Sequence, residues 1–228
     1  GDFLHEFEHL EIDTLETVIL LNLPDGIKKV ALNPAAQWAP CFGPTVADFN
    51  NDGHEDVFLS QNLDTGNHKW GRMDAGHGLL LLGDGEGNLN AIPSTASGIR
   101  LKNEQRGTAS ADFNQDGKMD LAVLERGKGA HLFVNQTEHT GVTVSLKGSS
   151  ANPHCIGARL QKINLQTGNV YGPSKEIQSG SGYRSLNSLK HVFAHPGKAF
   201  QIQVTWPNGK ISRHSIPSGI TTVTLQQP

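Results

Sequence analysis

The apolar residues of this chain stand in short runs, and turn-forming residues separate one run from the next. Runs of roughly four to eight residues, either continuous or alternating with polar residues, are typical of β-strands and short for an amphipathic helix. The pattern therefore predicts an all-β chain. The expected strands are TVILLNL, IKKVAL, VFLS, LLLL, LAVL and AHLFVN in the first two thirds, and VTVSL, QIQVTW and KISRHSI in the last third.

Two of the expected strand pairs are separated by strong turn signals. Pro24-Asp25-Gly26 lies between TVILLNL and IKKVAL, and Pro207-Asn208-Gly209 lies between QIQVTW and KISRHSI. Short segments rich in Pro, Asn, Asp and Gly between apolar runs are typical of β-hairpins. We therefore expect one hairpin near the start of the chain and one near its end.

The last third of the sequence differs from the rest. Alternation there gives VTVSL and QIQVTW one apolar face each, which in QIQVTW is formed by Ile202, Val204 and Trp206. The Asp-rich loops of the earlier part do not recur. We therefore expect two domains, at residues 1–140 and 141–228.

Composition and charge limit the function classes. Of the 228 residues 26 are glycine, only 18% are charged, and the formal net charge is −3. Abundant glycine favours strands with tight turns, and the near-neutral charge argues against a nucleic-acid or anionic-membrane surface. No apolar run approaches the roughly 20 residues of a membrane-spanning helix. The chain starts at Gly1 without a visible signal peptide, so we expect a processed or engineered piece.

One motif occurs twice with the same spacing: ADFNNDGHEDVFL begins at Ala47, and ADFNQDGKMDLAVL begins at Ala111. Each copy has oxygen-bearing side chains at positions 1, 3, 5 and 9 of a loop, a glycine at position 6, and a backbone carbonyl available at position 7. Oxygen ligands in this order suit calcium. The predicted ligands of two calcium ions are Asp48, Asn50, Asp52, His54 (carbonyl) and Asp56, and Asp112, Asn114, Asp116, Lys118 (carbonyl) and Asp120.

Two other interpretations of this motif compete with calcium binding by strand-flanked loops. An EF-hand needs a bidentate glutamate at position 12 and flanking helices, but position 12 is Leu59 or Val123 and the flanks are expected strands. A metal-free surface turn rich in Asp, Asn and Gly is the other alternative. Two copies with all ligand positions matched weigh against it.

The motif and its surroundings resemble FG-GAP/VCBS repeats, whose calcium loops join strands of β-propeller blades. Phe42-Gly43 precedes the first loop, and LLLLGDGEGNLN looks like the later strand and turn of such a repeat. The stretch after residue 140 resembles the ASPIC/UnbV domain through LKGSSANPHCIGARL, KEIQSGSGYRSLNS and VTWPNGK. Leu186 stands where that family usually has Gln, and FAHPGK replaces its Phe-Gly-Leu-Gly run. The combination resembles the one in secreted proteins related to cartilage acidic protein.

The resemblance implies two or three propeller-like blades followed by a compact β domain, with structural calcium and a location outside the cytoplasm. A propeller usually needs four or more blades, so the remaining blades are expected in a longer parent chain. We expect a binding or adhesion module for a protein or carbohydrate ligand at the cell surface, and not an enzyme. The alternative is a secreted hydrolase acting on glycan or peptide, with a site in residues 61–78 or in the C-terminal domain.

Residues 61–78 form an insertion between two expected strands. Loops on a rigid scaffold often carry binding function, and this one combines aromatic and charged groups. The alternative is an ordinary solvated loop with its tryptophan packed on the blade. The residues of the expected ligand surface are His68, Trp70, Arg72 and Asp74.

Several further groups have weaker functional signals. HEFEH, at residues 5–9, matches a zinc-protease pattern, but it lies almost at the start of the chain and lacks an evident third ligand, so we expect no zinc at His5 and His9.

Cys41 and Cys155 could form a disulfide, although two buried thiols are favoured. Asn135-Gln136-Thr137 is a glycosylation sequon. A hydrolase in the last domain could use His154, Cys155, Arg159, Ser181, Tyr183, Arg184 and His191, none of which forms a known nucleophile motif.

Overall fold

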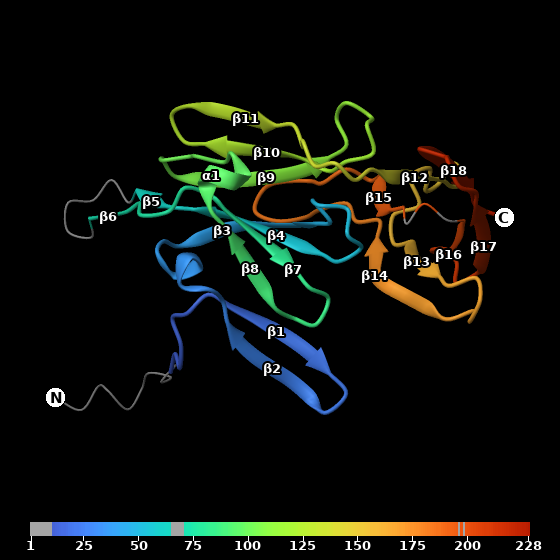
Figure 1. The fold of residues 1–228 in the computed structure, drawn as a ribbon, viewed down its shortest axis with the longest axis horizontal. Helices are drawn as coiled ribbons and strands as arrows, with labels where there is room; N and C mark the ends of the chain where they lie inside the picture. The colour runs from blue at the N-terminus through green and yellow to red at the C-terminus, as the bar shows by residue number, and fades with distance from the viewer. Residues whose placement is uncertain (1–10, 65–70, 196, 198) are drawn as a thin grey trace.

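The structure is a computed structural model that describes residues 11–64, 71–195, 197 and 199–228. Strands dominate it, in several small and mainly antiparallel sheets (Figure 1). The prediction that the chain consists mainly of β-strands is confirmed. Among the described residues, the all-β prediction misses two single-turn helices, the 3-10 helix Pro34–Gln37 and α1 (Ser94–Ser97). No helix in the described part of the chain is long and apolar enough to cross a membrane.

The first large sheet has four antiparallel strands in the order β3-β4-β7-β8. Their bounds are β3 (Cys41–Ala47), β4 (Asp56–Gln61), β7 (Leu79–Gly83) and β8 (Leu89–Ile92). The runs VFLS and LLLL form β4 and β7 as the sequence predicts, and both strands are largely buried. Residues 48–55 connect β3 to β4, so the first Asp-rich loop lies between paired strands.

The second sheet repeats this connectivity with three strands in the order β11-β10-β9. Its strands are β9 (Gln105–Ala111), β10 (Asp120–Glu125) and β11 (Gly129–Phe133). The hydroxyl of Thr108 in β9 donates to the Gly43 carbonyl in β3 at 2.9 Å, which joins the two sheets at their first strands. The shared core includes Phe58, Leu121 and Val123. The two Asp-rich loops are therefore held side by side.

A hairpin of β1 (Val18–Leu23) and β2 (Gly26–Ala31) precedes these sheets and projects from the first one (Figure 1). The turn signal Pro24-Asp25-Gly26 is confirmed, with Gly26 as the first residue of β2. A short two-stranded sheet of β5 (Leu63–Asp64) and β6 (Arg72–Met73) begins the insertion that the sequence predicts.

The C-terminal part encloses its own core between two sheets. One has the order β15-β12-β18, and the other β14-β13-β16-β17. Trp206, Ile202 and Val204 are almost completely buried there, as the alternation predicts. The strands are β12 (Gly141–Lys147), β13 (Arg159–Ile163), β14 (Val170–Glu176), β15 (His191–Ala194), β16 (Phe200–Thr205), β17 (Ile211–Ile216) and β18 (Thr222–Gln226).

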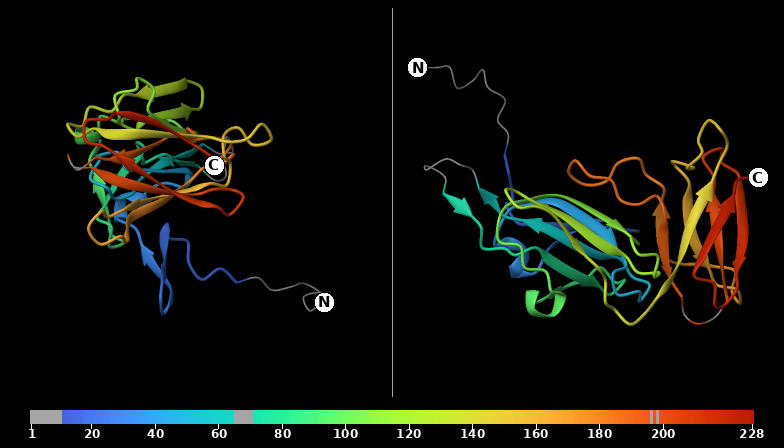
Figure 2. Two further views of the ribbon diagram at one scale, coloured as in Figure 1. Left: turned by 90° about the vertical axis from the view of Figure 1, so that its right-hand side faces the viewer. Right: turned by 90° about the horizontal axis from the view of Figure 1, so that it is seen from above.

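The C-terminal strands gather at the end of the molecule opposite β5 and β6 (Figures 1 and 2). The Ser188 backbone N–H donates to the Ser110 carbonyl of β9 at 2.8 Å, and the Gly141 N–H donates to the Gly117 carbonyl at 2.8 Å. The C-terminal part thus contacts both β9 and the second Asp-rich loop. The division into domains at residue 140 stays a prediction.

Candidate calcium-binding loops

The two Asp-rich loops, here loop 1 (residues 48–56) and loop 2 (residues 112–120), share one backbone conformation. Position 4 has a left-handed backbone in both, with φ of 56° at Asn51 and 62° at Gln115. Position 6 is glycine with φ of 96° at Gly53 and 78° at Gly117. Glycine is favoured at such angles because it has no Cβ. The repeated sequence therefore encodes a repeated turn, and not only a repeated composition.

The first aspartate of each loop accepts two backbone N–H groups. In loop 1 Asp52 N donates to Asp48 Oδ1 at 3.1 Å and Gly53 N donates to Oδ2 at 2.9 Å. Loop 2 repeats both bonds on Asp112, at 3.0 Å and 3.1 Å. These bonds fix the first carboxylate over the turn.

Positions 3 and 5 are joined in the same way in both loops. Asn50 Nδ2 donates to Asp52 Oδ2 at 2.8 Å, and its counterpart Asn114 donates to Asp116 Oδ2 at 3.0 Å. The other oxygen of each position-5 carboxylate accepts the N–H of the position-7 residue, at 2.8 Å in loop 1 and 3.0 Å in loop 2. Each of these oxygens keeps a second lone pair.

The last aspartate of each loop ties the loop to the third strand. Phe49 N donates to Asp56 Oδ2 at 2.8 Å, and Gly83 N at the end of β7 donates to Oδ1 at 2.9 Å. Asp120 accepts corresponding bonds from Phe113 and Asn135, at 2.9 Å and 2.8 Å. The exposed fractions of Asp56 and Asp120 are 0% and 1%. Both carboxylates are thus structural acceptors as well as predicted ligands.

Burial makes the negative charge in loop 1 costly. It raises the pKa of Asp56 to about 6, in part against the backbone N–H bonds from Gly83 and Phe49. Burial also raises the pKa of Asp48. Within the described residues no lysine, arginine or histidine forms a salt bridge with Asp56 or Asp120. A buried carboxylate without a cationic partner is energetically expensive.

The donor set of each loop fits calcium in type. All side-chain donors are oxygens, three of the four are carboxylates, and the hydrogen bonds of each loop leave a lone pair on at least one oxygen at each of positions 1, 3, 5 and 9. In the described part of the chain, however, no group of three or more Asp, Glu, His or Cys side chains is arranged as a formed metal centre. The carboxylates would therefore have to draw together around an ion.

Loop 1 has two cationic neighbours from the C-terminal part, which the sequence does not predict. Lys162 of β13 and Lys175 of β14 are 5% and 9% exposed, and both interact electrostatically with Asp48. Lys175 Nζ also lies 2.9 Å from Glu55 Oε1. Burial lowers the pKa of Lys162, while Asp48 opposes this effect.

Loop 2 receives a neutral contact from the C-terminal part instead. Thr143 Oγ1 of β12 donates to Asp112 Oδ2 at 2.7 Å. The two loops also contact each other, because Asn51 Nδ2 donates to the Gly117 carbonyl at 3.2 Å. The loops and the C-terminal strands therefore form one continuous polar contact region.

The sequon asparagine belongs to this region. Asn135 Nδ2 donates to the Phe49 carbonyl at 2.6 Å and to the Met119 carbonyl at 3.0 Å, while Oδ1 accepts Thr137 N at 2.9 Å. Its side-chain nitrogen is the atom that a glycan would modify. In this fold that nitrogen is occupied by two backbone acceptors.

The expected ligand surface is only partly described. His68 and Trp70 lie outside the described residues. Arg72 Nη2 lies 2.8 Å from Asp74 Oδ2, and both residues line a polar cleft of about 270 Å³. Asn103 and Arg126 line the same cleft. The cleft lies by β5 and β6, at the far end of the strands from loops 1 and 2.

The polar candidates of the C-terminal part do not form one site. Ser181 and His191 both line a cleft of about 400 Å³ beside β3. His191 Nε2 lies 3.1 Å from the Glu176 carbonyl, and burial lowers the pKa of His191 to about 4. Ser181 Oγ accepts Asn187 N at 2.8 Å. The others, His154, Cys155, Arg159, Tyr183 and Arg184, do not line this cleft.

The cysteine prediction is confirmed in part. Cys41 and Cys155 are free thiols, with Cys155 buried and Cys41 only half-buried. Burial raises the pKa of Cys41 to about 11. The zinc-protease pattern at His5 and His9 lies outside the described residues.

Comparison with known proteins adds a distant relationship. No family model matches the chain. It is 27% identical to human cartilage acidic protein 1 over 178 residues, which cover 76% of the chain and 26% of that protein. The chain is distantly similar to cartilage acidic protein 1. The mouse cartilage acidic protein 1 gives 28% identity over 183 residues, covering 75% of the chain and 26% of the protein. The chain thus spans about a quarter of the length of these relatives.

Proposed function

We propose that this chain is a calcium-stabilised β module that binds a protein or carbohydrate outside the cytoplasm, with two structural calcium ions in loops 1 and 2. The observation that carries the proposal is the repetition of one hydrogen-bonded turn around the same oxygen-bearing residues. A metal-free turn does not require three carboxylates at matched positions. An ion of charge +2 offsets their mutual repulsion and the burial of Asp56 and Asp120.

We further propose that the sheets are FG-GAP/VCBS-type blades of an incomplete propeller. The β1–β2 hairpin and the 3-10 helix precede β3 as β7, β8 and α1 precede β9. On this view the hairpin is the outer half of another blade. Its Leu20 and Ile27 are 61% and 71% exposed, which is expected where an adjoining blade surface is absent from the described residues.

The polar cleft by β6 is the proposed ligand surface. Arg72, Asp74, Asn103 and Arg126 give it both charge signs and several hydrogen-bonding groups, which suit a hydroxyl-rich or charged ligand. The cleft lined by Ser181 and His191 gives little support to the alternative function, a hydrolase. Ser181 Oγ and His191 Nε2 have separate partners, Asn187 N and the Glu176 carbonyl, and burial lowers the pKa of His191 to about 4, which makes it a weak base near neutral pH.

Calcium titration calorimetry on chelator-treated protein tests the proposal. We expect two bound ions for the parent chain and one each for Asp52→Ala and Asp116→Ala. Asp84→Ala is the matched control, because Asp84 lies in an exposed Asp-Gly turn and accepts the Glu86 N–H at 2.8 Å in a similar local bond. Two ions should remain in that variant. Absence of calcium binding by the parent chain would refute the proposal.

A further inference from the structure

We propose that the outer edge of β11 binds one extended peptide strand, whose apolar side chains fill the pocket between the two Asp-loop sheets. This surface is separate from the polar cleft by β6, so the proposal goes beyond the proposed function and names a class of partner for a second site.

β11 is the structural counterpart of β7. Leu121 of β10 pairs with Phe133, as Val57 of β4 pairs with Leu81. Two residues further along, Asn135 N and Gly83 N donate to the last aspartate of their respective loops. β11 therefore pairs with β10 in the same register in which β7 pairs with β4.

The first sheet continues beyond this strand, and the second does not. β8 pairs antiparallel with β7, with Ala91 opposite Leu81 and Leu89 opposite Gly83. Leu89 and Ala91 pack against the core formed by Leu59, Leu79 and Leu81. In the second sheet β11 is the outermost strand among the described residues. After Asn135 the chain leaves this sheet and enters β12.

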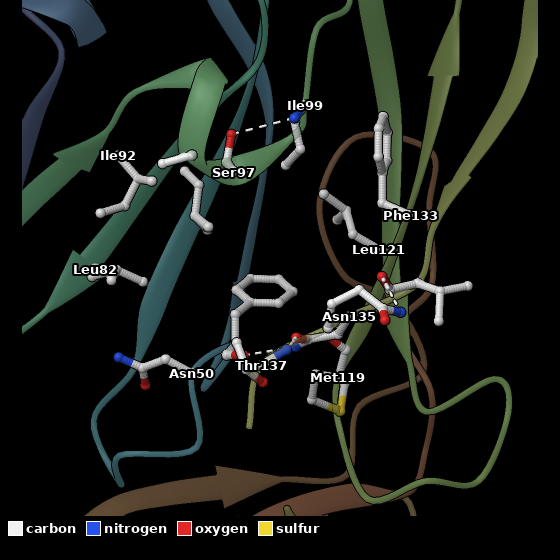
Figure 3. A pocket seen from close by; sticks show the side chains of 15 residues that line it. Asn50, Leu82, Ile92, Ser97, Ile99, Met119, Leu121, Phe133, Asn135 and Thr137 are labelled. Atoms are coloured by element: carbon white, nitrogen blue, oxygen red, sulfur yellow. Dashed lines mark hydrogen bonds between the residues drawn. The ribbon is translucent and has the colours of Figure 1, made fainter. Parts of the chain in front are cut away.

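A pocket of about 380 Å³ lies where the missing strand would point its side chains. Leu82 and Ile92 of the first sheet form one wall, and Leu121 and Phe133 of the second form the other (Figure 3). No lining residue is charged. Phe133 of β11 and Val134 just after it both line the pocket, and Val134 is 43% exposed. The pocket and the strand edge are thus parts of one surface.

The first sheet indicates how a strand would occupy this surface. An antiparallel strand in the β8 register places one side chain opposite Phe133, at the position of Ala91, and another opposite Asn135, at the position of Leu89. Directly opposed residues share a face of a sheet, so both side chains would point toward the pocket. Backbone pairing supplies affinity and the apolar pocket supplies selectivity, as in other cases of strand addition. The partner is therefore a peptide segment with apolar residues at alternate positions.

A tethered peptide tests the proposal. The variant Lys128→Cys offers an exposed thiol in the turn before β11, while Cys155 is buried and burial raises the pKa of Cys41 to about 11, so both native thiols react slowly at neutral pH. The probe is Asn-Leu-Asn-Ala-Ile, the sequence of residues 88–92, followed by Gly-Gly-Cys and joined by a disulfide. The control peptide has aspartate in place of the leucine and the alanine.

We expect the apolar peptide to slow amide hydrogen exchange in residues 130–134 about tenfold, and the aspartate peptide to leave it unchanged. Equal exchange with both peptides would overturn the proposal. Sedimentation of the parent chain supplies a second measurement. A dimer with β11 protected would assign the edge to a second copy and also overturn it. Calcium content, measured on the same samples, distinguishes this failure from failure of the proposed calcium sites.

Discussion

Gly83 and Asp56 are joined by a 2.9 Å hydrogen bond from the Gly83 backbone nitrogen to Oδ1 of the aspartate. The bond links the last position of loop 1 to the end of β7, and Asn135 makes the same link to Asp120 in the second sheet. The loop aspartates therefore hold three strands in register. Any ion bound in a loop would act directly on the geometry of its sheet.

Asp56→Asn should destabilise the protein even in chelator. Both oxygens of Asp56 accept backbone N–H groups. In asparagine an NH₂ group replaces one of these oxygens, and it cannot accept the hydrogen bond from the backbone N–H that it faces. The expected loss is about 1–3 kcal/mol in the free energy of unfolding. Urea denaturation of the parent and variant measures it. Asp84→Asn, at an exposed turn, should leave the value nearly unchanged, and equal effects of the two substitutions would contradict the assigned role of Asp56.

Asn135 should carry no glycan when the protein is made in a glycosylating host. Its Nδ2 is bonded to the Phe49 and Met119 carbonyls, and a glycan would remove one donated hydrogen and require space at that atom. Intact-mass spectrometry of the folded protein checks this. The control Thr137→Ala removes the sequon and should give only the mass change of the substitution. A glycan lost in the control would show that Asn135 is accessible.

Acid should destabilise the fold through His191. Burial and, to a smaller extent, the neighbouring Lys175 lower the pKa of His191 from 6.5 to about 4, although the Glu176 carbonyl and Glu55 oppose the shift. Between pH 6.5 and about 4 the unfolded chain binds a proton that the folded chain does not, so stability falls as the pH falls. Urea midpoints at several pH values should show a weaker decline in His191→Gln. An identical decline in both proteins would exclude this contribution.

Lys162→Met should strengthen calcium binding in loop 1. Lys162 and Lys175 interact with Asp48, and their positive charges oppose an ion there. Removing one charge should raise the affinity of one of the two sites roughly three- to tenfold, as expected for about 0.7–1.4 kcal/mol of repulsion. Calorimetry separates the two sites. Lys147→Met, on an exposed lysine at the end of β12, is the matched control and should leave both affinities unchanged.

Local patterns in the sequence predict much of this structure. The alternating and continuous apolar runs predict β4, β7, β10 and the hairpin of β16 and β17, and repeated spacing predicts the turns of loops 1 and 2. Such features depend on near neighbours in the chain. They are the ones that a single sequence specifies most directly.

The contacts that the sequence does not predict join distant segments. β14 contains Gly172 and Pro173, which obscure a strand pattern, and its position at the edge of the sheet tolerates them. Because β14 is not predicted, neither is the burial of Lys175 beside loop 1. An alignment of the β7 and β11 sequences places Gly83 opposite Asn135, whose backbone N–H groups donate to the last aspartate of loop 1 and of loop 2. No local pattern indicates that Thr143 contacts Asp112.

Thermal unfolding with and without calcium tests the central claim most directly. If loops 1 and 2 bind structural calcium only in the folded state, each filled site adds about 2.7 kcal/mol at a hundredfold excess of calcium over its Kd. For a chain of this size two such sites should raise the Tm by roughly 10–20 °C relative to chelator, and Asp52→Ala or Asp116→Ala should each remove about half of the rise. Equal Tm values for the parent chain in calcium and in chelator would contradict the account.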